Sequence, residues 1–147
     1  MRIESILPVA RQRMITVQAD ASLVDAAHLL SDTHRALLVA CNDDGAMVGV
    51  ITKTDVVRQV ALCHGVVDSK PISEVMTQTI TSCRTDDLLH DVLALMKSRG
   101  FVHIPIIDQN SRPCGVVNAR DALQALLREV KDEELILRAY VMGVGYH

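Results

Sequence analysis

The chain has 147 residues, a formal net charge of −3 and a mean hydropathy of +0.22. Its 15 Lys and Arg are scattered among 18 Asp and Glu, without the basic run that a nucleic-acid partner requires. No stretch approaches the roughly 20 apolar residues of a membrane span, and the first residues lack the pattern of a secretory signal. We therefore expect a cytoplasmic protein with no membrane partner, and the apolar share of 49% favours a homodimer that covers part of this surface.

The cysteines give no sign of a disulfide framework or a metal centre. Cys41, Cys63, Cys83 and Cys114 show no C-x-x-C spacing, and nothing indicates a secreted protein. The chain also has no phosphate-binding P-loop and no spacing typical of a nucleophile and its base. We therefore expect no metal, no obligatory cofactor and no enzymatic activity, with the cysteines packed as small core residues.

In chain order, the first expected element is a short helical turn at residues 3–7, which should end before Pro8 because proline disfavours a helical conformation in the preceding residue. The next is an amphipathic helix that starts at Ser22, whose hydroxyl can form a capping box with Asp25. Its apolar positions recur with helical spacing and are expected to be buried: Leu23, Ala26, Ala27 and Leu30.

A β-hairpin is expected after this helix. Its two apolar runs, residues 36–41 and 46–51, are joined by the strong turn sequence N-D-D-G. A second amphipathic helix comes next and should end near Gly65. Its predicted buried residues are Val56, Val57 and Val60. We assign residues 1–65 to one unit and residues 66–71 to a linker.

Residues 72–130 repeat this order of elements. A turn at residues 72–76 and an apolar stretch at 79–81 come first, and the first copy has about four extra residues at this point, near positions 9–13. The second hairpin is expected to have strands at residues 101–107 and 114–117. Two helices are predicted in this repeat. The first starts near residues 85–87 and is predicted to bury Leu88, Val92, Leu95 and Met96. The second closes the repeat and is predicted to bury Leu123, Leu126, Leu127 and Val130.

The end of the chain has no counterpart in the first copy. Residues 131–134, K-D-E-E, are expected to cap or interrupt the last helix, and an apolar run follows at residues 135–144. We assign residues 131–147 to a C-terminal helical tail.

The most similar parts of the two copies are their strand-to-helix turns. The sequence G-V-I-T-K-T-D at residues 49–55 returns as G-V-V-N-A-R-D at residues 115–121. Each has a glycine and two β-branched residues that end a strand, and then an acid that starts a helix. Because a helix N-terminus carries unpaired N–H groups and a positive dipole end, a phosphate fits beside the Thr52 hydroxyl. The Asp55 carboxylate is then available to a ribose diol.

These turns, together with V-M-T at residues 75–77 and I-P-I-I-D at 104–108, resemble those of the cystathionine β-synthase (CBS) domain pair. The resemblance covers about residues 3–130. It implies an α/β fold of two tandem β-α-β-β-α repeats packed as a pseudo-twofold pair, with two clefts that commonly bind AMP, ATP or S-adenosylmethionine. Modules of this family are regulatory rather than catalytic.

Carried over to this chain, the resemblance implies that Thr52 and Asp55 bind phosphate and ribose. The residues implied for the opposite wall of this cleft are Ile80, Thr81, Val102 and His103, ahead of Pro105. The residues implied for the pseudo-equivalent cleft are Asn118, Arg120, Asp121, Ile15, Thr16 and Leu37. Because Asn118 replaces the family's hydroxyl residue and the first copy has no proline matching Pro105, we expect the Thr52 cleft to bind more tightly.

Other interpretations of single residues stay open. Thr52 and Asp55 also fit a helix cap, a role compatible with ligand binding. His103 also fits a packed, hydrogen-bonded strand residue. Aromatic residues make up only 2% of the chain, so an adenine ring must lie largely between aliphatic side chains.

The functional prediction is a regulatory, energy-sensing module that binds AMP, ADP or ATP and signals to an unidentified effector protein through rearrangement of a dimer. Lys53 and the helix N-terminus favour a phosphate-bearing ligand. The alternatives are an S-adenosylmethionine sensor and a dimerisation scaffold with vestigial clefts. A small hydrolase that uses the scattered His and Cys residues has the least support.

Overall fold

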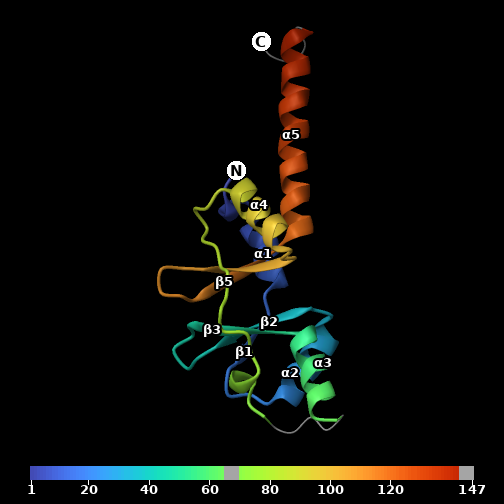
Figure 1. Cartoon of the computed structure of the whole chain (residues 1–147). Helices are drawn as coiled ribbons and strands as arrows, with labels where there is room; N and C mark the ends of the chain where they lie inside the picture. Colours follow the sequence, from blue (N-terminus) through green and yellow to red (C-terminus); the bar gives the residue numbers. More distant parts are fainter. Residues whose placement is uncertain (65–69, 143–147) are drawn as a thin grey trace.

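The computed structural model describes residues 1–64 and 70–142. Two small sheets lie at the centre of the body (Figure 1). Helices α2 (Leu23–Thr33) and α3 (Lys53–Leu62) lie on one outer side, and α1 (Leu7–Arg13), α4 (Leu89–Arg99) and α5 (Ala119–Val141) lie on the other. In the described residues, no helix combines the length and apolar character of a membrane span.

The sheets are built around the two predicted hairpins. In the first sheet, β1 (Thr16–Gln18) pairs in parallel with β2 (Leu37–Cys41), which pairs antiparallel with β3 (Met47–Thr52). In the second, β4 (His103–Ile107) pairs antiparallel with β5 (Pro113–Asn118). Each repeat therefore presents a hairpin whose second strand leads into a helix, which confirms the predicted α/β fold with tandem repeats.

Both hairpin turns are closed by a side-chain oxygen. Asn42 Oδ1 accepts the amides two and four residues further on, both at 3.0 Å. Asp108 Oδ1 does the same in the second hairpin, at 2.8 and 3.0 Å. Asn and Asp favour turns because their short side chains can bond to the nearby backbone, so local sequence sets both hairpins.

Each repeat is completed by the segment that precedes the other one. Ile3, in the short 3-10 helix η1 (Ile3–Ile6), packs in one core with Leu89 of the second repeat. Ile72, in η2 (Ile72–Glu74), packs in the other core with Leu23 of the first repeat. The two amides make equivalent bonds, from Ile3 to the Asp87 carbonyl at 2.9 Å and from Ile72 to the Ala21 carbonyl at 2.8 Å. This exchange relates the two repeats as a pseudo-twofold pair.

The predicted helical turn at the start of the first repeat is present as η1, but the chain stays helical after it. The helix does not end before Pro8, because Pro8 lies in the first turn of α1, where no intrahelical N–H is needed. The extra residues of the first copy thus form α1, whose Ala10 packs closely against Gly115 of β5. In the second copy, residues 79–81 form no regular strand, and only an isolated parallel bridge joins Cys83 to Ile106.

The helix starts depend on local capping. The Ser22 hydroxyl accepts the Asp25 amide at 3.1 Å, so α2 begins where predicted. The start of α4 differs, because the Asp87 carboxylate accepts the Arg84 amide at 2.9 Å and closes a turn before the helix. As a result Leu89 is buried and Leu88, predicted to be buried, is exposed.

The closing helices are less buried than predicted. Several residues expected in the core are exposed: Val57, Leu123, Leu127 and Val130. In α5 the inward face consists instead of small residues such as Ala122, with Leu126 partly buried. The helix also continues through residues 131–134, so the predicted interruption is wrong; Lys and Glu are good helix formers. Helix α3 ends at Leu62, close to the predicted end near Gly65, whereas most of the predicted 66–71 linker lies outside the described residues.

The cysteines are core or half-buried residues. Cys41 and Cys83 are buried, and Cys63 and Cys114 are half-buried. Burial raises the pKa of the Cys83 thiol to about 12. This thiol therefore stays protonated at neutral pH, as expected for a packing residue.

Candidate ligand-binding cleft

A cavity of about 490 Å³ lies where β3 leads into α3 and the start of β4 comes close to the connector that follows η2. Its volume is within the roughly 300–1,000 Å³ typical of small-ligand pockets. Threonines and apolar residues make up most of the lining, which consists of Ala36, Leu37, Val50, Thr52, Lys53, Thr54, Thr77, Thr79, Ile80, Thr81, Gly100, Phe101, Val102, His103 and Pro105.

The Thr52 turn forms a complete capping box at the start of α3. The Thr52 hydroxyl oxygen accepts the Asp55 amide at 3.1 Å, and Asp55 Oδ2 accepts the Thr52 amide at 3.0 Å. The hydroxyl hydrogen of Thr52 remains able to donate to a ligand. Asp55 is only 7% exposed and does not line the cavity, and its Oδ1 lies 3.6 Å from the Arg58 guanidinium. The structure therefore places Thr52 at the cavity and Asp55 directly behind it.

The cavity has the electrostatics of an anion site. Among the described residues that line it, Lys53 carries the only full charge, and none is a carboxylate. The Lys53 amide donates to the Ala36 carbonyl at 3.1 Å, which ties the start of α3 to β2. The next amide, that of Thr54, belongs to the first turn of α3, whose N–H groups lie at the positive end of the helix dipole.

His103 is held as a neutral ring at the edge of the cavity. Asn118 Oδ1 accepts the amides of Arg120 at 2.9 Å and Asp121 at 3.3 Å, so its amide nitrogen must donate to His103 Nε2, 3.2 Å away. The acceptor Nε2 leaves the proton on Nδ1. Burial, together with the positive charge of Arg13, lowers the pKa of His103, and this stabilises the neutral form.

Several residues of the cavity were not predicted from the sequence. They are Ala36, Val50, Thr54, Thr77, Thr79, Gly100 and Phe101. A usable signal was the alternation T-x-T-x-T at residues 77–81, because alternate residues of an extended segment lie on one face. Phe101, the only phenylalanine of the chain, follows Gly100, whose positive φ of 69° ends α4 and turns the chain toward β4.

The Asn118 turn is arranged differently. Asn118 caps α5, but the Asp121 carboxylate accepts from Nε and Nη2 on one edge of the Arg13 guanidinium, with 3.0 Å between Nη2 and Oδ1. This hydrogen bond raises the pKa of Arg13 and keeps the ion pair intact at neutral pH. Ile15 and Thr16 lie at β1 and outside the 490 Å³ cavity, whereas Leu37, predicted for this second cleft, lines the Thr52 cavity.

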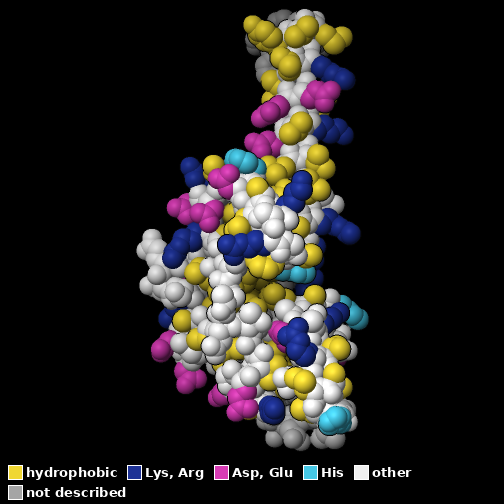
Figure 2. All heavy atoms as spheres, viewed as in Figure 1, with side chains coloured by type: hydrophobic (Ala, Val, Ile, Leu, Met, Phe, Trp, Pro, Cys, Tyr) yellow, Lys and Arg dark blue, Asp and Glu magenta, His cyan; other side chains and the backbone are white. Residues whose placement is uncertain are grey.

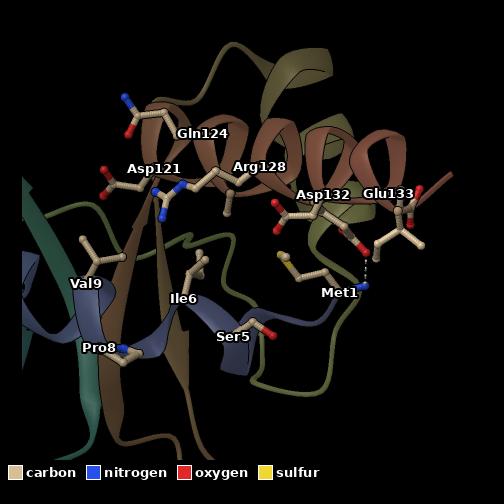
Figure 3. A pocket seen from close by; sticks show the side chains of 13 residues that line it. Met1, Ser5, Ile6, Pro8, Val9, Asp121, Gln124, Arg128, Asp132 and Glu133 are labelled. Atoms are coloured by element: carbon tan, nitrogen blue, oxygen red, sulfur yellow. Dashed lines mark ion pairs between the residues drawn. The ribbon is translucent and has the colours of Figure 1, made fainter. Parts of the chain in front are cut away.

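Asp121 also lies beside a separate groove of about 600 Å³ between the N-terminal segment and α5 (Figure 3). Figure 3 shows Asp132 and Glu133 further along the same helix, with Met1 facing them. The N-terminal amine of Met1 lies 3.9 Å from Glu129. This groove is more acidic than the Thr52 cavity and does not share its lining.

The fold and the repeated turns define the class of protein. The family model of the CBS domain matches residues 3–62 and again residues 72–128. The chain therefore belongs to the CBS domain family, with two domains in tandem.

The chain is similar to other proteins of this architecture. It is 30% identical over 119 residues to an uncharacterised 17.7 kDa protein of Acidianus ambivalens. The match covers 81% of this chain and 71% of that protein. The crystal structure of the CBS-pair protein CBSX2 from Arabidopsis thaliana has a TM-score of 0.76 and 20% identity, covering 88% of this chain and 96% of that one. The CBS domain pair of protein MJ0100, in complex with 5′-methylthioadenosine and S-adenosylmethionine, has a TM-score of 0.73 and 22% identity, covering 88% and 98%. The TM-scores show a shared fold, and at such low identities the solved structures show the fold alone.

Other relatives are much longer than this chain. A homoserine O-acetyltransferase of Methanosphaera stadtmanae matches over 70% of this chain but only 20% of its own length. The shared part is therefore a fraction of that enzyme.

Proposed function

We propose that this chain is a regulatory module that binds an adenine nucleotide, AMP, ADP or ATP, in the Thr52 cleft. The observation that carries this proposal is the combination of one lysine, no carboxylate and a capped helix N-terminus in a single cavity that also has an apolar wall. A nucleotide needs both parts, because its phosphate is anionic and its base is flat and largely apolar. A structure of CBSX2 in complex with AMP supports this choice by analogy of fold.

The proposed pose follows from the positions of the donors. The phosphate lies at the start of α3, where it accepts from the Thr52 hydroxyl and the Thr54 amide and is close to Lys53. The base lies between the aliphatic side chains of Ile80 and Val102, with Phe101 at the edge. Asp55 lies behind Thr52 and does not line the cavity, so the proposal assigns its Oδ1 to the ribose diol on the condition that the Thr52–Asp55 turn opens toward the cavity when the ligand binds.

The proposed response is regulatory, with no catalytic step. Nucleotide binding shifts the population between two arrangements of a homodimer, and an unidentified effector protein responds to the shift. A scaffold whose clefts bind nothing is the competing hypothesis, and a measurement of binding separates the two.

S-adenosylmethionine is the second candidate ligand, because the MJ0100 domain pair binds it. Its sulfonium and ammonium groups are cationic, and the cavity offers them Lys53 and no carboxylate. The charge of the lining therefore favours the nucleotide.

Isothermal titration calorimetry of the purified chain with AMP, ADP, ATP and S-adenosylmethionine tests the proposal. We expect at least one nucleotide to bind, and Lys53→Gln to weaken its affinity by roughly tenfold, as for loss of one charged hydrogen bond. Lys97→Gln is the matched control, because Lys97 is exposed on α4 and does not line the cavity. Binding of S-adenosylmethionine alone would contradict the electrostatic argument, and no binding of any adenosine compound would support the scaffold.

A further inference from the structure

Helix α5 extends far beyond the body of the molecule. It has 23 residues and a length of about 34 Å, and its N-terminal part packs against α4, β5 and η1. The remainder projects from the body (Figure 1). The family match ends at residue 128, so the projecting part is not explained by the shared CBS architecture.

An exposed apolar stripe runs along this helix. Its members, which we call the α5 seam, alternate at intervals of four and three residues: Leu123, Leu127, Val130, Leu137 and Val141. All five are exposed, and the only break in the pattern is Glu134. An average spacing of 3.5 residues is the pattern with which one helix supercoils around another. Figure 2 shows hydrophobic side chains gathered at the far end of α5, above a charged band.

We propose that the α5 seam packs in parallel against the same seam of a second copy of this chain. The charged residues beside the seam select this occupant and this direction. In a parallel pair each Glu133 faces Arg138 of the second copy, which gives two attractive pairs. In the antiparallel pair that matches all seam positions, Glu133 faces Glu133 and Lys131 faces Lys131, so like charges repel. The seam is thus complementary to itself in the parallel direction.

Glu134 sets the strength of this contact. It occupies a seam position, and it is paired within its own helix to Arg138 at 3.0 Å. In the parallel dimer the two Glu134 carboxylates come close to each other, which costs stability but fixes the register, as polar residues in coiled-coil seams do. Glu134→Leu is therefore expected to tighten the dimer.

Sedimentation equilibrium of the full chain tests the seam with two matched variants. Leu137 is 62% exposed and lies in the seam, whereas Leu135 is 55% exposed and lies outside it. We expect Leu137→Glu to raise the dimer dissociation constant by at least about tenfold and Leu135→Glu to leave it unchanged. Equal effects of the two variants, or a monomeric wild type at high micromolar concentration, overturn the proposal.

Disulfide trapping tests the direction independently. In the parallel pair the two Val141 positions face each other, so Val141→Cys should cross-link faster than Leu135→Cys and faster than the wild type. A rate for Val141→Cys no higher than that of Leu135→Cys overturns the parallel arrangement.

The proposed regulatory function requires a homodimer, and the α5 seam would form one. The seam proposal rests on that function only for its biological role, because the contact itself needs no nucleotide. Calorimetry with AMP on Leu137→Glu separates the two proposals. Loss of the dimer with nucleotide binding retained supports the seam and leaves the nucleotide site intact. A dimer that forms through the seam in a chain that binds no nucleotide leaves the seam standing and removes the nucleotide hypothesis.

Discussion

The two strand-to-helix turns of this chain share one sequence pattern and have different surroundings. At the first turn, Asp55 bonds to the Thr52 amide, and Thr52 lines an open cavity. At the second, Asp121 is bound by Arg13 from α1, the segment that the second repeat lacks. A single inserted helical turn has therefore given the second acid a permanent partner inside the chain. Equivalent residues in a repeat keep equivalent chemistry only where the neighbouring repeat supplies equivalent contacts.

The largest expected effect is the loss of nucleotide affinity in Asp55→Ala. Removing the carboxylate takes away the proposed ribose acceptor, and a hydrogen bond to a charged group is worth about 1.5–3 kcal/mol, so affinity should fall roughly ten- to hundredfold. Calorimetry with AMP measures this. Asp55→Asn keeps an oxygen that can accept from the Thr52 amide but removes the negative charge. It therefore separates the effect of the lost helix cap from the effect of the lost charge on affinity. If Asp121→Ala abolishes binding while Asp55→Ala retains it, the principal binding site is the cleft at the Asn118 turn.

Releasing Asp121 tests whether Arg13 causes the difference between the turns. Arg13→Ala should destabilise the fold by about 1.5–3 kcal/mol, because the half-buried ion pair is lost. It should also raise the number of nucleotides bound per chain from one toward two. Urea unfolding and the stoichiometry from calorimetry report the two effects. An unchanged stoichiometry would show that Asn118, and not Arg13, limits the second cleft.

The cap residues offer a finer comparison. Thr52→Val removes the hydroxyl and should lower nucleotide affinity roughly tenfold while costing about 1 kcal/mol of stability through the lost cap. Thr52→Ser keeps the hydroxyl and should retain both properties. The same calorimetry and urea unfolding apply, and equal affinities of the Val and Ser variants would contradict a phosphate contact at Thr52.

The smallest expected effect comes from His103, which lies opposite Asn118 in the hairpin, where the first repeat has Leu37 opposite Thr52. Because the pKa of His103 is lowered in the folded state, the unfolded chain binds more protons near this pKa. The contribution of His103 to stability is therefore complete above its unfolded pKa of about 6.5 and is lost as the pH falls through the lower folded value. Urea unfolding between pH 5 and 7.5 should show a weaker pH dependence in His103→Gln than in the wild type. An identical pH dependence would mean that this ring titrates normally.

Local sequence was sufficient for the features that depend on neighbouring residues. The hairpins follow from Asn42 and Asp108, whose side chains bond to the backbone a few residues away. The start of α2 follows from Ser22, and the cap at Thr52 was one of the two roles considered for it. The repeated turns were also enough to identify the family, because their order and spacing occur twice.

Only the tertiary structure determined which segments complete which repeat. Ile3 and Ile72 look like the starts of their own repeats, yet each is buried in the other core. Arg13 and Asp121 are 108 positions apart, and no periodicity connects them. Caps and turns are short-range and therefore visible in the sequence, whereas these contacts depend on how whole segments dock, which no local pattern records.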